Sequence, residues 1–114
     1  MVADPHDHLD ITVQADGDRA VMRVQGEIDL STAPEVRAEV GRIAMPGMQV
    51  VIDLTGVGFM DSTGLGSLVW ARRRLRRIGG DILIVRPRPN VRRVLEISGV
   101  SQIVPVEGFP PPAA

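Results

Sequence analysis

The stretch that decides the fold is VIDLTGVGFMDSTGLG, residues 51–66. An apolar run passes into glycines, and an Asp-Ser-Thr triplet stands just before Gly64. A short apolar run indicates a buried strand, and the residues after the triplet follow a helical period, so the triplet lies between a strand and a helix. Such a junction is compatible with a phosphate-binding loop, a serine nucleophile or a turn that caps the helix.

The residues before this stretch predict a hairpin and a helix. LDITVQA (9–15) and RAVMRVQGEID (19–29) alternate apolar and polar residues, which is typical of two paired strands at a sheet edge. The period then becomes helical, and we expect a helix from near Thr32 to just before Pro46. Thr32 and Glu35 have the spacing of a capping box, which predicts a reciprocal pair of hydrogen bonds at the helix start.

The remaining segments complete an α/β pattern. In chain order they are a central strand covered on both faces at 48–54, a helix at 64–78, a second buried strand at 81–87, a short helix at 89–99 and a last strand at 102–106. The order is ββαβαβαβ, with three to four helices. Strands separated by helices pair in parallel through right-handed crossovers, so we expect a mostly parallel central sheet with the N-terminal hairpin at its edge.

Length and composition indicate a single cytoplasmic domain. The chain has 114 residues, no cysteine, no lysine and a net charge of −1, which excludes cysteine-based metal sites and a general attraction to nucleic acid. No apolar run reaches the roughly 20 residues of a membrane span, and the N-terminus lacks the pattern of a secretory signal. We expect the domain at residues 9–106, between a flexible N-terminal segment (1–8) and a flexible C-terminal tail (107–114).

Two interpretations of the opening stretch fail on residue identity. A P-loop requires a lysine that this chain lacks, and the glycines match only the start of a dinucleotide fingerprint, with Val69 where a small residue is needed. A hydrolase nucleophile in GxSxG would need glycine in place of Met60, and the only histidines, His6 and His8, are near the N-terminus. The sequence therefore predicts no cofactor, no metal and no catalytic residue.

Two interpretations of Ser62 remain open on local chemistry. The first is that Ser62 or Asp61 is only the N-cap of the following helix. The second is that Ser62 is modified, because a hydroxyl at a helix N-terminus beside a parallel sheet is accessible to a partner enzyme. A phosphate there would add about −1.5 to −2 charges, which the helix dipole and free N–H groups would tolerate.

A family resemblance favours modification. VIDLTGVGFMDSTGLGSLV (51–69) resembles the signature of the STAS-domain anti-sigma factor antagonist family. GEIDLSTAPEV (26–36) and IGGDILIVRPRPNVRRVLEISGV (78–100) resemble further segments of that family, including its Gly-Gly turn. The similarity covers residues 9–106.

The resemblance implies a phosphorylation switch in which this chain is not an enzyme. In the family, the serine after the aspartate, here Ser62, is phosphorylated by the anti-sigma factor, an ATP-dependent serine kinase. The unphosphorylated antagonist binds the anti-sigma factor and releases the sigma factor, the phosphorylated form does not bind, and a serine phosphatase restores it. Thr63 is a secondary acceptor candidate, and Asp29 and Asp61 are expected near the phosphoacceptor.

The resemblance also implies that the first loop and the second helix form the docking face. The expected partner-binding residues are Asp29, Asp61, Thr63, Gly64, Gly66, Trp70 and Arg73. By helical phase Trp70 points away from the buried stripe toward Gly66 and Arg73, as an interface anchor beside a charged rim would. Five of the thirteen arginines lie between Arg72 and Arg77, and they favour recognition of an acidic partner over nucleic acid. Arg72 falls on the inward stripe, where its stem would cover apolar surface and its guanidinium reach water.

Two alternatives stay open at this point. The chain is compatible with a STAS subunit of a larger signalling complex, and with a small-molecule or nucleotide-binding module that uses the same loop. For the antagonist we expect a monomer or weak dimer that contacts neither nucleic acid nor membrane.

Overall fold

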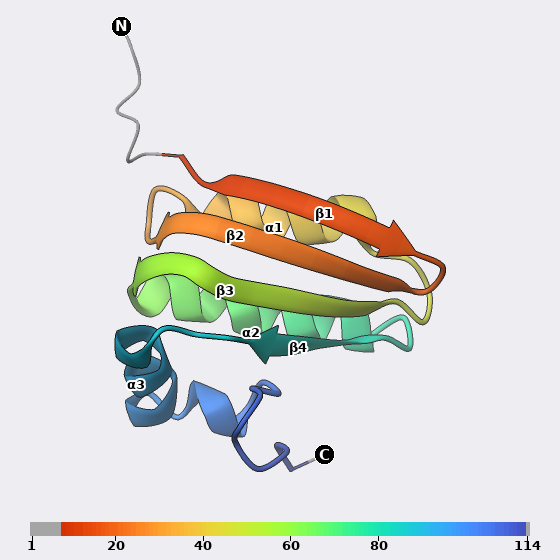
Figure 1. Cartoon of the computed structure of the whole chain (residues 1–114). Coiled ribbons are helices and arrows are strands. Elements are labelled where there is room, and N and C mark those ends of the chain that lie inside the picture. The colour runs from red at the N-terminus through yellow and green to blue at the C-terminus, as the bar shows by residue number, and fades with distance from the viewer. Residues whose placement is uncertain (1–7, 114) are drawn as a thin grey trace, which may run out of the picture.

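The computed structural model describes residues 8–113 and contains one four-stranded sheet with three helices (Figure 1). The elements in chain order are β1 (Asp10–Asp16), β2 (Arg19–Ile28), α1 (Ala33–Ile43), β3 (Gln49–Met60), α2 (Ser62–Arg76), β4 (Asp81–Val85), α3 (Pro89–Ile97) and a short 3-10 turn, η2 (Val100–Gln102).

The sheet has the mixed topology that the sequence predicts. Its strand order is β1-β2-β3-β4, with β1 antiparallel to β2, and with β2, β3 and β4 parallel to one another. The α/β class, the edge hairpin and the mostly parallel sheet are therefore confirmed.

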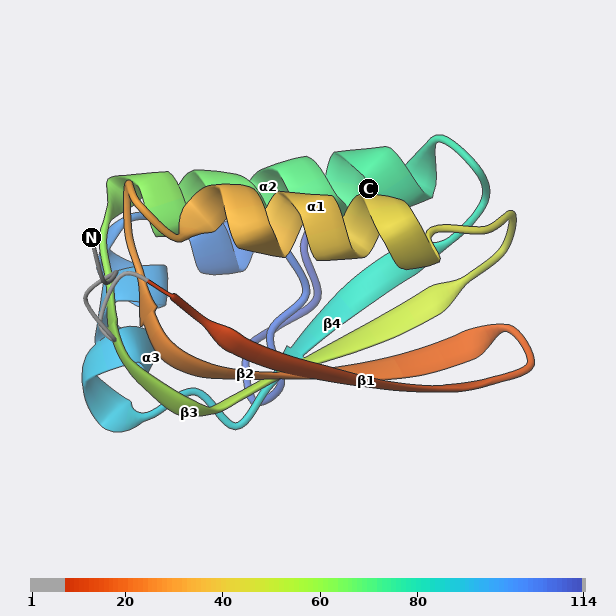
Figure 2. The same cartoon turned by 90° about the horizontal axis from the view of Figure 1, so that it is seen from above.

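The two long helices cover one face of this sheet. Figure 2 shows α1 and α2 side by side above it, and the side chains between the two layers form the core, among them Met22, Ile52 and Leu68, all fully buried. The opposite face of the central strands carries Arg23, Asp53 and other polar residues. The expectation of a central strand covered by apolar layers on both faces was wrong, because an apolar run does not reveal which face stays open.

Strand β3 is longer than the apolar run at 48–54. It continues through Gly56 and Gly58 to Met60. Two register shifts against β2 absorb the extra residues, the first where Gln25 pairs with Gly56. A Cβ on Gly56 would lie 2.5 Å from Cγ of Gln25, so glycine is required for this close approach. The glycines thus belong to the strand, which leads directly into α2.

The predicted last strand at 102–106 was wrong. Only a single parallel bridge forms, between Ile84 and Val106. The N–H of Ile84 donates to the carbonyl of Pro105 at 2.9 Å, and the N–H of Glu107 donates to the carbonyl of Ile84 at 2.8 Å. Proline has no N–H for a ladder, and the η2 turn occupies the start of the segment, so the observed order is ββαβαβα.

Helix α1 begins where the sequence predicts, but the capping box does not form. The Thr32 hydroxyl donates to the carbonyl of Glu27 at 2.6 Å and accepts from the N–H of Asp29 at 2.9 Å. The Glu35 carboxylate accepts from the N–H of Leu9 at 3.3 Å. Both side chains therefore join the helix start to the strands instead of capping each other.

The structure describes more of the C-terminal end of the chain than of the N-terminal end. Of the expected N-terminal segment, residues 1–7 lie outside the described residues. At the other end, Phe109 packs against the core, and the guanidinium of Arg92 lies 4.1 Å from the centre of its ring. Between residues 8 and 113, no helix combines the length and apolar character that a membrane crossing requires.

Candidate functional site

Helix α2 starts with a side-chain cap from Asp61. One carboxylate oxygen of Asp61 accepts from the N–H of Gly64 at 2.9 Å and from the hydroxyl of Thr63 at 2.8 Å, and its carbonyl accepts from the N–H of Leu65. The hydrogen bond from Gly64, helped by Thr63, lowers the pKa of Asp61. Asp61 is therefore the N-cap, and Ser62 is the first helical residue.

The two hydroxyls after Asp61 differ in availability. Thr63 is half-buried and its hydroxyl is bound to Asp61. Ser62 is exposed, and its hydroxyl makes no hydrogen bond with another residue of the described part of the chain. Of the two acceptor candidates, Ser62 is the one presented to solvent.

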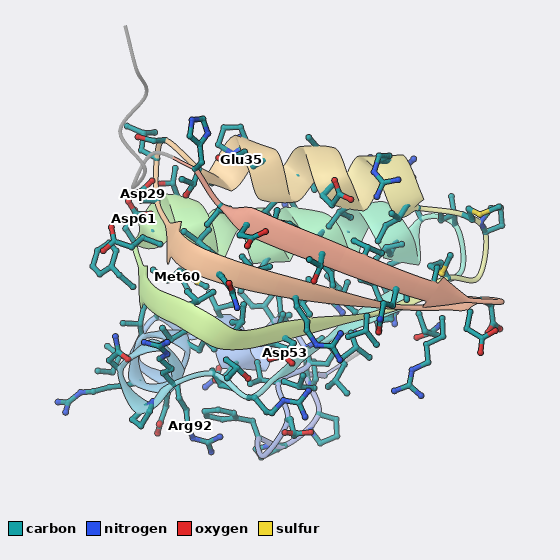
Figure 3. All side chains as sticks on the ribbon, turned by 45° about the horizontal axis from the view of Figure 1, so that its top comes forward. Asp29, Glu35, Asp53, Met60, Asp61 and Arg92 are labelled. Atoms are coloured by element: carbon teal, nitrogen blue, oxygen red, sulfur yellow. The ribbon has the colours of Figure 1, made fainter. Side chains whose placement is uncertain are left out.

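Asp29 lies at the same end of the molecule as Asp61, as Figure 3 shows. Its carboxylate accepts from the N–H groups of Ser31 at 3.0 Å and Thr32 at 3.2 Å, which holds the turn between β2 and α1. The N–H of Asp61 donates to the carbonyl of Ile28 at 3.2 Å, so this turn and the start of α2 are joined. The structure thus brings Asp29, Asp61 and Ser62 to one end of the sheet.

The two glycines of the site have different surroundings. Gly64 is buried, and a Cβ there would lie 2.4 Å from the carbonyl oxygen of Ile28, so glycine lets α2 approach β2. Gly66 is exposed, and a Cβ there would meet nothing within 4 Å. Of the two glycines in the expected partner-binding set, only Gly66 offers its surface to another molecule.

An exposed face of α2 extends from Ser62 along the helix. Gly66 follows Ser62 by four residues and Arg73 follows Gly66 by seven, which places the three on one stripe. Trp70 stands beside the stripe, 37% exposed, and lines a hollow of about 530 Å³ together with Gly66, Arg73 and Arg77. The prediction that Trp70 points toward these residues is confirmed.

Two exposed apolar residues flank this end of the molecule and were missed in the sequence. Leu30, in the turn before α1, is 74% exposed, and Phe59, near the end of β3, is 48% exposed. Leu30 directly follows Asp29, and Phe59 precedes Ser62 by three residues. Their positions close to the aspartates in the sequence could have indicated that they belong to the site. Single apolar residues at strand ends are, however, usually assigned to the core.

The arginines of α2 divide into two groups. Arg72 donates from Nε to Asp81 at 3.1 Å and from Nη1 to the carbonyl of Ile103 at 2.7 Å, and its side chain is 16% exposed. Beyond the predicted position on the inward stripe, the structure shows that Asp81 and the carbonyl of Ile103 bind its guanidinium. Arg76 also pairs with Asp81, at 3.4 Å, whereas Arg73 forms no ion pair in the described part of the chain.

The glycine-containing segment does not form a nucleotide cradle. Gly56 and Gly58 are part of β3, and the N–H of Gly64 is bound to Asp61. Within residues 8–113, no three His, Cys, Asp or Glu side chains are arranged to hold a metal ion. The chemistry of this end of the molecule is that of a free hydroxyl at a helix start, beside two carboxylates.

The fold and this arrangement agree with comparisons to known proteins. The model of the STAS domain matches residues 10–110. The anti-sigma-B factor antagonist of Listeria monocytogenes is 38% identical over 96 residues, which cover 82% of this chain and 83% of the relative. This chain belongs to the STAS-domain anti-sigma factor antagonist family. Its members are regulators and not enzymes, and an antagonist of an anti-sigma factor binds that factor.

Solved structures of the STAS family share the fold. The crystal structure of an anti-sigma factor antagonist from Mycobacterium paratuberculosis has a TM-score of 0.78 and 28% identity, and the match covers 95% of this chain and 92% of that one. The phosphorylated form of the Bacillus cell fate determinant SpoIIAA has a TM-score of 0.63 at 22% identity, with 85% of this chain and 90% of that one covered. At that identity the second likeness concerns the fold alone.

Proposed function

We propose that this STAS protein is switched by phosphorylation of Ser62. In the unphosphorylated form it binds an anti-sigma factor that is itself a serine kinase, and the bound sigma factor is released for transcription. Phosphorylation of Ser62 by that kinase ends the binding, and a serine phosphatase restores it. The protein acts in the cytoplasm as a monomer or weak dimer.

The observation that carries this proposal is the free hydroxyl of Ser62. A kinase must bring the acceptor oxygen in line with the transferred phosphoryl group, so the hydroxyl must be accessible and not committed elsewhere. Ser62 meets both conditions at the start of α2, whereas the neighbouring hydroxyl of Thr63 is bound to Asp61. Thr63 is thus a secondary acceptor at most.

The proposed binding surface surrounds this hydroxyl. We define the docking face as Leu30, Phe59, Ser62, Gly66, Trp70 and Arg73, all exposed. Exposed apolar and aromatic side chains together with an arginine are the composition of interface centres. Asp29 and Asp61 shape the turn and the helix start that hold this face in position.

The electrostatic setting explains why a phosphate would act as a switch. The start of α2 tolerates negative charge, so the fold persists after modification. Asp29 and Asp61 are already negative here, and neither is paired with an arginine in the described part of the chain. A phosphate dianion brought into a close interface would have to be desolvated, and unless the partner supplies cations the cost is several kcal/mol. Because each ~1.4 kcal/mol changes affinity tenfold, that cost is enough to end binding.

The direct test is to incubate the protein with its anti-sigma factor and ATP and to map the modified residue by mass spectrometry. We expect one phosphate, on Ser62, and none on Ser62→Ala. Thr63→Ala is the matched control and should be phosphorylated like the unaltered protein. A phosphate found only at another residue, or undiminished phosphorylation of Ser62→Ala, would overturn the assignment.

A further inference from the structure

A second hollow lies on the face of the sheet that α1 and α2 leave uncovered. It measures about 390 Å³ and lies at the first register shift between β2 and β3. Its polar lining comes from Arg23, Gln25, Asp53, Thr55 and Arg88. Figure 3 shows Asp53 on the middle of β3, away from the end that carries Asp29 and Asp61.

Asp53 and Arg88 stabilise the irregular backbone at this point. The carboxylate of Asp53 accepts from the N–H of Thr55 at 2.9 Å and from its hydroxyl at 2.7 Å. Nε of Arg88 donates to the carbonyl of Thr55 at 2.8 Å. These bonds satisfy the backbone groups that the register shift takes out of the ladder, and they fix the walls of the hollow.

Positive charge exceeds negative charge around the hollow. Arg86 donates to the carboxylate of Asp53 at 2.7 Å, and Nε of Arg23 lies 3.8 Å from the same oxygen. Arg86 adopts a left-handed backbone conformation, φ 50°, which is rare for a residue with a side chain. Two guanidinium groups thus lie within ion-pair distance of one carboxylate, and Arg88 adds a third positive charge to the lining of the hollow. Since Arg86 already neutralises Asp53, Arg23 and Arg88 carry the excess.

The free donors of these two arginines border the hollow from two elements, because Arg23 lies in β2 and Arg88 directly precedes α3. Arg88 uses Nε for Thr55, and Arg23 uses Nη1 for Gln14 at 3.3 Å. Their other guanidinium N–H groups make no hydrogen bond with a residue in the described part of the chain. Guanidinium groups are suited to anionic oxygens, and two that approach from different elements, a strand and a helix start, fit a tetrahedral anion better than a planar one.

We infer that the hollow between Arg23 and Arg88 binds a small phosphate-bearing ligand. The volume exceeds the size of a single phosphate, so it accommodates either a free phosphate or the phosphate group of a larger molecule. The site is independent of Ser62, because it is on the opposite face of the sheet from α2. It also differs from a nucleotide loop at the glycines, because arginine side chains supply its charge.

The test is a titration of ¹⁵N-labelled protein with inorganic phosphate, pyrophosphate and ATP at constant ionic strength, with acetate as a planar anion for comparison. We expect saturable shifts of the backbone signals of Gln25, Thr55 and Gly56. The strongest of the three phosphate probes distinguishes a free phosphate from a phosphate on a larger ligand. Arg23→Gln and Arg88→Gln should each raise the Kd about tenfold, as expected for loss of one charge-assisted contact.

Two controls make the result decisive. Arg93→Gln removes an exposed arginine of α3 that does not line the hollow and should leave the Kd unchanged, and so should Ser62→Ala. Thermal unfolding shows whether each variant is folded, and if Arg88→Gln fails to fold, Arg23→Gln carries the test. Absence of saturable shifts with all three phosphates, or equal weakening by Arg93→Gln, would overturn the site without bearing on Ser62.

Discussion

The carboxylate of Asp61 holds the hydroxyl of Thr63 at 2.8 Å. This contact assigns different tasks to neighbouring residues that look equivalent in the sequence. Thr63 is part of the cap that starts α2, whereas Ser62 keeps its hydroxyl free at the surface. Capping thus belongs to Asp61, and Ser62 is left as the residue at which we propose modification.

The cap itself can be tested by stability. Asp61→Ala removes the acceptor for the N–H of Gly64 and should lower the free energy of unfolding by about 1 kcal/mol, measured in urea. Asp61→Asn is the control, because asparagine is as good an N-cap and should retain most of the stability. Equal stability of the alanine variant and the unaltered protein would show that the cap contributes nothing.

The exposed glycines of α1 and α2 provide a matched pair for the docking face. Gly41 and Gly66 both lie in helices and have open space where a Cβ would stand, so Gly41→Gln and Gly66→Gln should each stabilise the fold by about 0.5 kcal/mol. Only Gly66→Gln places a side chain in the hollow beside Trp70. It should weaken binding of the anti-sigma factor by about tenfold or more, measured by calorimetry, since a packed interface does not absorb added volume. Equal affinities of the two variants for the anti-sigma factor would show that α2 is not part of the docking face.

Substitution of Arg72 and of its neighbour Arg73 should affect different properties of the protein. Arg72→Gln leaves the carbonyl of Ile103 without its donor and weakens the contact with Asp81, so it should lower the free energy of unfolding by about 1 to 3 kcal/mol. Arg73→Gln should change stability by less than about 0.5 kcal/mol and weaken partner binding instead. Chemical unfolding and calorimetry on both variants check this. Similar stabilities would show that the contacts of Arg72 carry no net free energy.

Acid stability should depend on Asp53. Burial raises the pKa of Asp53, but hydrogen bonds from Arg86 and Thr55 outweigh burial and lower the pKa from 3.8 to about 2. Because the folded pKa is the lower one, this stabilisation is present above about pH 4 and is lost as the pH falls toward 2. It amounts to at most about 2 kcal/mol, since Arg86 is largely exposed.

The measurement for Asp53 is urea unfolding between pH 5 and pH 2. The stability advantage of the unaltered protein over Asp53→Asn should shrink across this range. Arg86→Gln removes the strongest of the bonds that lower the pKa, so its acid loss should begin at higher pH. An advantage that stays constant down to pH 2 would show that ionisation of Asp53 does not contribute to acid stability.

The sequence predicted the elements whose periodicity is strong and misplaced those that depend on backbone pairing. The hairpin and the three helices follow from alternation and helical spacing, which burial of one face imposes. Gly56 and Gly58 indicated a loop, yet they lie in β3 because the register shifts against β2 need residues without side chains. Pro105 stood in an apolar run, but it cannot donate to a ladder, so the last strand is reduced to one bridge.

The sequence predicted the motif at the candidate site but not the exposed residues that surround it. The Asp-Ser-Thr triplet located the cap, because capping depends on adjacent residues, and phosphorylation of Ser62 stays a prediction. The exposure of Leu30 and Phe59 depends on where β2 and β3 end in space, which periodicity does not give. The sequence did not reveal the hydrogen bonds of Arg72, because its partners Asp81 and Ile103 are not its neighbours in the sequence.

In the proposed switch, the phosphate on Ser62 controls binding of the anti-sigma factor. The most direct measurement compares the Kd of the anti-sigma factor for the unphosphorylated protein and for the protein phosphorylated stoichiometrically at Ser62, by calorimetry without ATP. We expect tight binding of the first and a Kd about a hundredfold higher or more for the second, which corresponds to ~3 kcal/mol of desolvation and repulsion. Equal affinity of the two forms would contradict the proposed switch.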